Sequence, residues 1–180
     1  PRRRHLSFLG ECQRVIRDRF VLGETISKAL ERAKTQEAKG YRYSYDMLGE
    51  GARTEKDAER YFQSYAAAIE AIGKSAGDKK LPDRPGISVK LSALHPRYEA
   101  SKGARVQEEL LPRLTKLVQV AREQDLNFTV DAAEADRHEV SLDAIAALLA
   151  EPVTEGVDGF GAGSYTHQTR PRQRGGGWGG

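Results

Sequence analysis

Residues 86–91 read GISVKL, and this short run decides the fold class. Its apolar and polar residues alternate, a period of two that is typical of a strand with one buried face. Two runs on either side of it, YRYSYD at 41–46 and LNFTVD at 126–131, alternate in the same way. We therefore predict three strands, and a fourth that begins near residues 157–161.

Amphipathic helices are predicted between these strands, because apolar side chains recur there at helical spacing. The predicted helical ranges are 13–39, 54–73, 104–124 and 141–150. Thr54 followed by Asp57 indicates a capped helix start, and Gly40 and Gly73 are expected to end two of the helices. A helix followed by three strand–helix units indicates an α/β fold with a parallel sheet; a (β/α)8 barrel and a doubly wound sheet both fit this order.

Each of the three strands carries a charged residue on its polar face near its end, namely Asp46, Lys90 and Asp131. In a parallel barrel the polar sets would point inward and meet at the carboxyl ends of the strands, where active sites form in that architecture. Charges also gather at strand ends simply because the chain leaves the core there. Three such residues in register favour a site over that simpler interpretation.

The loops behind the strand ends add further polar candidates. These are Glu50, Ser92, His95, Arg97, Tyr98, Glu134, Asp136 and Arg137. A single loop histidine more often makes a structural hydrogen bond than acts as a base, and acidic residues can prepare a helix start. The histidines do not show metal-ligand spacing, and the single Cys12 allows neither an internal disulfide nor a thiolate metal site.

The net charge of +3 comes from the two ends of the chain. Residues 1–5 and 162–180 contain six arginines and no acid, and the remainder holds 23 basic against 26 acidic residues. A nucleic-acid partner would therefore depend on these ends alone. No apolar run is long enough to cross a membrane, no start resembles a secretory signal, and cysteine is scarce, so we expect a cytoplasmic location.

Three stretches point to one family: YRYSYDMLGEGART, RPGISVKLSALHPRYE and VDAAEADRHEVSLD. They resemble the proline dehydrogenase domain of bacterial bifunctional proline utilisation proteins, and the resemblance runs from about Val15 to about Gly161. It implies a partial (β/α)8 (TIM-like) barrel of about three to four βα units, preceded by helices. Residues 1–40 would form the helical lead-in, 41–161 the partial barrel, and 162–180 an aberrant, disordered Gly/Arg-rich tail.

The resemblance also implies the chemistry. The family binds FAD, oxidises L-proline to Δ1-pyrroline-5-carboxylate and passes the electrons to membrane quinone, which suggests a cytoplasmic protein peripheral to the inner membrane. Lys90 would help to hold the proline carboxylate, Asp131 would lie beneath substrate and flavin, and Asp46 and Glu50 would line the same cavity. The main FAD contacts of the family would lie beyond this chain.

The sequence departs from the family pattern in two places. Ala133 replaces an acid, and Tyr165 stands where the family has a flavin-contacting glutamine. Because a complete barrel takes about 250 residues, we expect the isolated 180 residues to bind FAD poorly and not to turn over proline. Two alternatives stay open: a Schiff-base enzyme using Lys90, and nucleic-acid binding through the basic ends.

Overall fold

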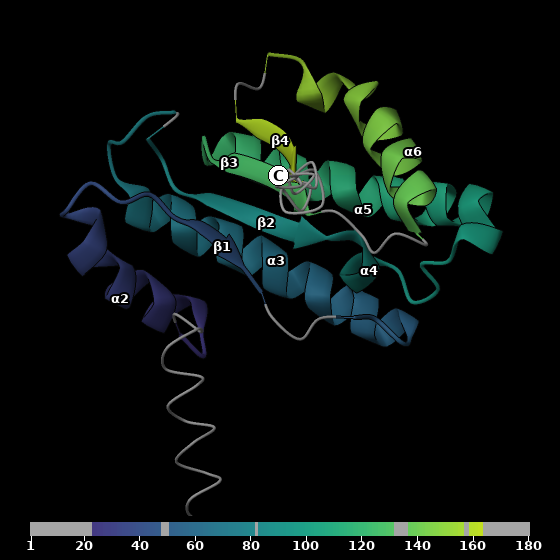
Figure 1. Cartoon of the computed structure of the whole chain (residues 1–180), viewed down its shortest axis with the longest axis horizontal. Coiled ribbons are helices and arrows are strands. Elements are labelled where there is room, and N and C mark those ends of the chain that lie inside the picture. The colour runs from purple at the N-terminus through teal and green to yellow at the C-terminus, as the bar shows by residue number, and fades with distance from the viewer. Residues whose placement is uncertain (1–22, 48–50, 82, 132–136, 157–158, 164–180) are drawn as a thin grey trace, which may run out of the picture.

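The computed structural model describes residues 23–47, 51–81, 83–131, 137–156 and 159–163 (Figure 1). Its strands are β1 (Ser44–Asp46), β2 (Gly86–Lys90), β3 (Asn127–Asp131) and β4 (Phe160–Gly163). They form one parallel sheet in the order β1-β2-β3-β4. A doubly wound sheet reverses its strand order at a switch point, whereas a barrel adds each strand beside the last. The described sheet therefore confirms the α/β class and is consistent with a partial barrel.

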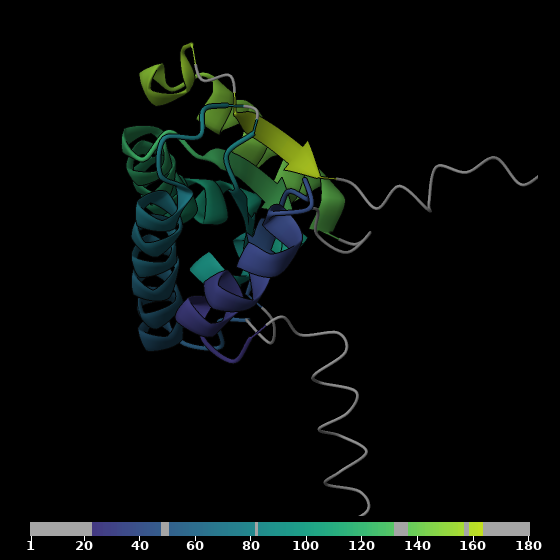
Figure 2. The ribbon, with the colours of Figure 1, turned by 90° about the vertical axis from the view of Figure 1, so that its left-hand side faces the viewer.

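The crossover connections are helical, as the hydrophobic periodicity predicts. The helices are α2 (Ile26–Glu37), α3 (Glu55–Ala76), α4 (Leu91–Leu94), α5 (Gly103–Glu123) and α6 (His138–Leu149), with 3-10 turns at Ala100–Lys102 and Pro152–Thr154. Figure 2 shows α3 and α5 side by side along one face of the sheet. Within the described segments, no helix is long and apolar enough to cross a membrane.

The core lies between these helices and the apolar face of the sheet. Ile87, Val89, Phe128 and Val130 are at most 1% exposed, so the predicted apolar parity of β2 and β3 is confirmed. Burial of such side chains is worth about 1.5–3 kcal/mol each. The opposite parity carries the polar residues, and this second face is where the candidate site lies.

The start of α3 is fixed by the predicted cap. The backbone N–H of Asp57 donates to the Thr54 hydroxyl (3.1 Å), and the Thr54 N–H donates back to the Asp57 carboxylate (3.1 Å). The Thr54 hydroxyl also donates to the Asp57 carboxylate (2.9 Å), and this hydrogen bond is the largest of the causes that lower the pKa of Asp57. The reciprocal bonds satisfy backbone donors that a helix start leaves open.

Four predicted details are wrong. The helix predicted over 13–39 is not helical at residues 23–25, where Thr25 is the N-cap of α2, and residues 13–22 lie outside the described part of the chain. The helix α2 ends at Glu37 with Ala38 as its C-cap, and Gly40 takes a positive φ of 90° beyond it. The helix α3 continues through Gly73 to Ala76 and is capped by Gly77 (φ 59°). The loop predicted after β2 opens instead with the short helix α4. Gly40 has a positive φ but lies beyond the end of α2, and Gly73 lies inside α3; the glycine with a positive φ that ends α3 is Gly77.

Gly73 has a packing role instead, which gives a first prediction. A Cβ at Gly73 would lie 2.8 Å from the Gln124 Cβ at the end of α5, so α3 and α5 approach there more closely than any side chain allows. We expect Gly73→Val to lower the free energy of unfolding by about 1–3 kcal/mol. Gly51→Val is the matched control, because a Cβ there meets nothing within 4 Å. Equal urea midpoints for the two variants would contradict this packing role.

Candidate active site

The three predicted charged residues lie together at the carboxyl ends of their strands. The Lys90 Nζ is 2.8 Å and 2.7 Å from the two carboxylate oxygens of Asp46. It is also 3.3 Å from an oxygen of Asp131. The three side chains are 24–33% exposed, so they are half-buried but open to solvent. The structure therefore brings together the side chains that the strand pattern singles out.

Strand register explains this arrangement. Lys90 pairs directly with Asp131, whereas Asp46 pairs with Ser88. Neighbouring residues in register have side chains on the same face, so all of these groups share the polar face of the sheet. The long Lys90 side chain reaches over the small Ser88 side chain to Asp46, and it stands between the two carboxylates.

The cluster holds one ammonium and two carboxylates, a net charge of −1. Such a site can bind a second cation, such as an amine, because its two carboxylates carry more negative charge than the one ammonium neutralises. The ammonium has three donors, and its longer contact to Asp131 is the one a substrate carboxylate can most easily replace. The arrangement thus suits a small molecule that carries both an amine and a carboxylate.

His95, in the loop after β2, is 2% exposed and bonds this loop to α5. The backbone N–H of Arg97 donates to the His95 Nδ1 (3.2 Å), so the Nε2 carries the proton and donates to Glu109 on α5 (2.9 Å). Arg105 donates to the other Glu109 oxygen (2.6 Å). His95 therefore has a structural hydrogen-bonding role between the loop and α5.

This anchor predicts an acid-sensitive contribution to stability. The hydrogen bonds from Arg105, and next from His95, lower the pKa of Glu109 below its ordinary value of 4.5. A lowered folded-state pKa stabilises the fold above the ordinary value, and the effect is lost as the pH falls through the lowered value. We expect Glu109→Gln to be less stable than the wild type at neutral pH, and the gap to close in acid. Glu108→Gln, on the exposed side of α5, should show no such gap in urea titrations at either pH.

The remaining loop candidates divide into two groups. Tyr98 is buried and bonded to the Ser141 hydroxyl (2.7 Å), which donates to the Arg137 carbonyl (2.9 Å). Burial raises the pKa of Tyr98, and the hydrogen bond between Tyr98 and Ser141 fixes the loop to α6.

Among the other loop candidates, the carbonyl of Ser92 accepts the Ala52 N–H (3.0 Å), and Arg97 is exposed. Glu50, Ala133, Glu134, Asp136 and Tyr165 lie outside the described residues, as do residues 1–5 and 164–180 of the basic ends. Residues 162 and 163, predicted to belong to the disordered tail, are instead part of β4.

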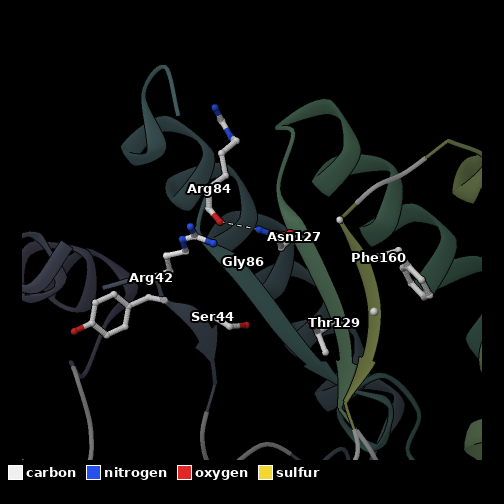
Figure 3. A pocket seen from close by; sticks show the side chains of 10 residues that line it. Arg42, Ser44, Arg84, Gly86, Asn127, Thr129 and Phe160 are labelled. Atoms are coloured by element: carbon white, nitrogen blue, oxygen red, sulfur yellow. Dashed lines mark hydrogen bonds between the residues drawn. The ribbon is translucent and has the colours of Figure 1, made fainter. Parts of the chain in front are cut away.

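A separate pocket of about 460 Å³ lies at the opposite, amino-terminal end of the strands (Figure 3). It touches none of the three charged site residues. Arg42 at its rim is paired with Asp83, and the Arg84 guanidinium points away from it to the carbonyls of Gly77 (2.9 Å) and Gln124 (3.0 Å). We therefore place the candidate site at the charged end, since the chemistry converges there.

Two residues that position other groups were missed from the sequence. Arg84 ties the ends of α3 and α5 together, and only its place just before β2 hints at this. Tyr65 on α3 accepts the backbone N–H of Lys90 (3.2 Å). Tyr65 was predicted as one member of an apolar helix stripe, and its hydroxyl contact could not be read from that pattern. In the described segments, no group of three His, Cys, Asp or Glu side chains could hold a metal ion.

Comparison with known sequences identifies the family. The sequence model of the family described as proline dehydrogenase matches residues 29–173, so the match extends past Gly161, the predicted end of the resemblance. Bifunctional protein PutA of Klebsiella aerogenes is 50% identical over 159 residues, 88% of this chain and 12% of that protein. Proline dehydrogenase 1 of Bacillus subtilis (strain 168) is 30% identical over 125 residues, 69% of this chain and 37% of that protein.

Solved structures agree with the sequences. A mutant of Bradyrhizobium japonicum Proline Utilization A (PutA) is 67% identical, covers 79% of this chain and 14% of its own, and superimposes with a TM-score of 0.68. PutA of Bdellovibrio bacteriovorus, at 20% identity, covers 87% of this chain and 17% of its own with a TM-score of 0.80, which supports the fold alone. The chain thus spans 12% of the bifunctional relative from Klebsiella aerogenes. With a family match over most of its length and the barrel-like parallel sheet, the chain belongs to the proline dehydrogenase family.

Proposed function

We propose that this chain forms part of an FAD-dependent enzyme that oxidises L-proline to Δ1-pyrroline-5-carboxylate. One observation carries the proposal: in a chain of the proline dehydrogenase family, the Lys90 ammonium lies between two carboxylates at the carboxyl ends of the strands. Proline carries a ring amine and a carboxylate close together, and the cluster offers a matching cation and two anions.

Each residue then has a role in binding. Lys90 holds the substrate carboxylate, Asp46 fixes the Lys90 ammonium through both of its oxygens, and Asp131 lies on the side that faces the ring nitrogen. Fixing the ring at both charged ends restricts its orientation, which is the main contribution a protein makes to such a reaction. The substrate loses a proton from nitrogen and a hydride from the neighbouring ring carbon, and a C=N double bond forms.

Beside Asp131, the described part of β4 carries small residues. Gly161 and Gly163 of β4 pair with Thr129 and Asp131, so β4 itself places no side chain beside these two residues on the inner face. A Cβ at Gly161 would meet only the Thr129 hydroxyl oxygen, at 3.8 Å. These glycines would accommodate FAD near Asp131, and the bound FAD would supply the acceptor for the hydride. We further propose membrane quinone as the final electron acceptor, with the protein cytoplasmic and peripheral to the inner membrane.

The proposal is tested with two ring amines. The gene product containing this chain is loaded with FAD and assayed for reduction of a soluble quinone by L-proline and by pyrrolidine, which lacks the carboxylate. We expect turnover of L-proline and a KM for pyrrolidine at least about 100-fold higher, because the contact to Lys90 is missing. Absence of turnover with L-proline would refute the proposal, and equal KM values would refute the role of Lys90.

The Schiff-base alternative fits the geometry less well. A nucleophilic lysine must be neutral, whereas two carboxylates around the Lys90 Nζ stabilise its charged form. Nucleic-acid binding through the arginine-rich ends stays a prediction, because the arginines of those ends lie outside the described residues.

A further inference from the structure

We infer that Tyr65 is a positioning residue for Lys90: its hydroxyl replaces a missing strand partner and fixes the backbone from which the site lysine extends. This inference rests on the proposed function, since it deepens the role of Lys90 as the group that holds the substrate carboxylate. Tyr65 lies on α3, on the opposite side of the sheet from the charged cluster, and does not itself touch the substrate.

The strand ladder shows why a replacement is needed. The Gly86 N–H donates to the Tyr43 carbonyl (2.9 Å), and every second residue of a strand directs its N–H to the same neighbour. The Lys90 N–H therefore points toward β1. Yet β1 ends at Asp46, opposite Ser88, so β1 stops before it can supply a carbonyl to Lys90. The Tyr65 hydroxyl lies there instead and accepts this N–H (3.2 Å).

Tyr65 is well suited to hold a fixed position. Its side chain is 0% exposed and belongs to the core. A buried tyrosine has few rotatable bonds and a rigid ring, so its hydroxyl is placed with little freedom. The helix that carries it is fixed at its start by the capping box of Thr54 and Asp57.

The position of Lys90 makes this contact consequential. Lys90 is the last residue of β2 and also the N-cap of α4, and its side chain makes no capping hydrogen bond. On one side its backbone is held by pairing with Asp131, and on the other by Tyr65. Loss of the Tyr65 contact would free one side of this junction and let the ammonium move relative to Asp46. Displacement of a binding group by about 1 Å is enough to weaken a site strongly.

The test is Tyr65→Phe in the FAD-loaded gene product, with KM and kcat for L-proline measured separately. We expect KM to rise about five- to tenfold, the change that loss of one hydrogen bond produces. Tyr98→Phe is the matched control, because it also removes a buried, hydrogen-bonded hydroxyl but leaves the contacts of Lys90 intact. Tyr98→Phe should change KM less than twofold. It should lower the melting temperature about as much as Tyr65→Phe does.

A double-mutant cycle separates positioning from general stability. In a Lys90→Met background, Tyr65→Phe should have no further effect on KM, because the group that it positions is gone. The same rise in KM with and without Lys90 would overturn the inference, as would a rise no larger than that of Tyr98→Phe. A wild type that does not oxidise L-proline would instead count against the proposed function, so the two failures are distinguishable.

Discussion

Lys90→Met should reduce kcat/KM for L-proline by at least about 100-fold, the largest effect that we expect from a single substitution. The variant removes the cation that is proposed to hold the substrate carboxylate. It also leaves Asp46 and Asp131 without the ammonium that lies between them. The two carboxylates would lose their shared cation, so the free energy of unfolding should fall at neutral pH. Steady-state kinetics and urea unfolding measure the two effects.

Two controls keep this prediction specific. Lys90→Arg retains a positive charge and should restore stability at neutral pH, even where the different geometry of the guanidinium limits turnover. Lys28→Met removes a lysine that is 63% exposed and pairs with Glu24, and it should leave both kinetics and stability unchanged. A Lys90→Met variant with wild-type kcat/KM would show that the substrate binds elsewhere.

Asp131→Asn should separate activity from stability. Lys90 keeps its shorter contacts to both oxygens of Asp46 in this variant, so the free energy of unfolding should change by no more than about 1 kcal/mol. The carboxylate proposed to face the ring nitrogen is lost, and kcat/KM should fall about 100-fold.

The matched control for this variant is Asp143→Asn on the exposed side of α6, which should behave as the wild type in both assays. If Asp131→Asn lost activity only in proportion to a loss of folded protein, Asp131 would have a structural role and not the proposed binding role.

Much of the fold was predictable because the strands and helices have different hydrophobic periods. The alternation in β2 and β3 predicted which side chains are buried, and the spacing of Thr54 and Asp57 predicted the start of α3. Helix ends were less predictable. Gly73 and Gly77 are both glycines near the end of α3, but only the three-dimensional packing against Gln124 shows that Gly73 permits a close approach and does not stop the helix.

The candidate site was predictable for a similar reason. Side-chain parity places Asp46, Lys90 and Asp131 on one face, and a parallel sheet brings strand ends together. The contacts that hold this cluster in place were not predictable, because they depend on which side chain meets which backbone group. Tyr65, which accepts the Lys90 N–H, and His95, which donates to Glu109, are separated from their partners by 25 and 14 residues. No local pattern connects such pairs.

The most direct test of the account is a crystal structure of the gene product containing this chain, with L-proline bound after chemical reduction of the flavin has blocked turnover. The account predicts the proline carboxylate within hydrogen-bonding distance of the Lys90 Nζ and the ring nitrogen on the side of Asp131. A proline molecule bound with its carboxylate away from Lys90, and with the contacts of Lys90 to Asp46 and Asp131 unchanged, would contradict it.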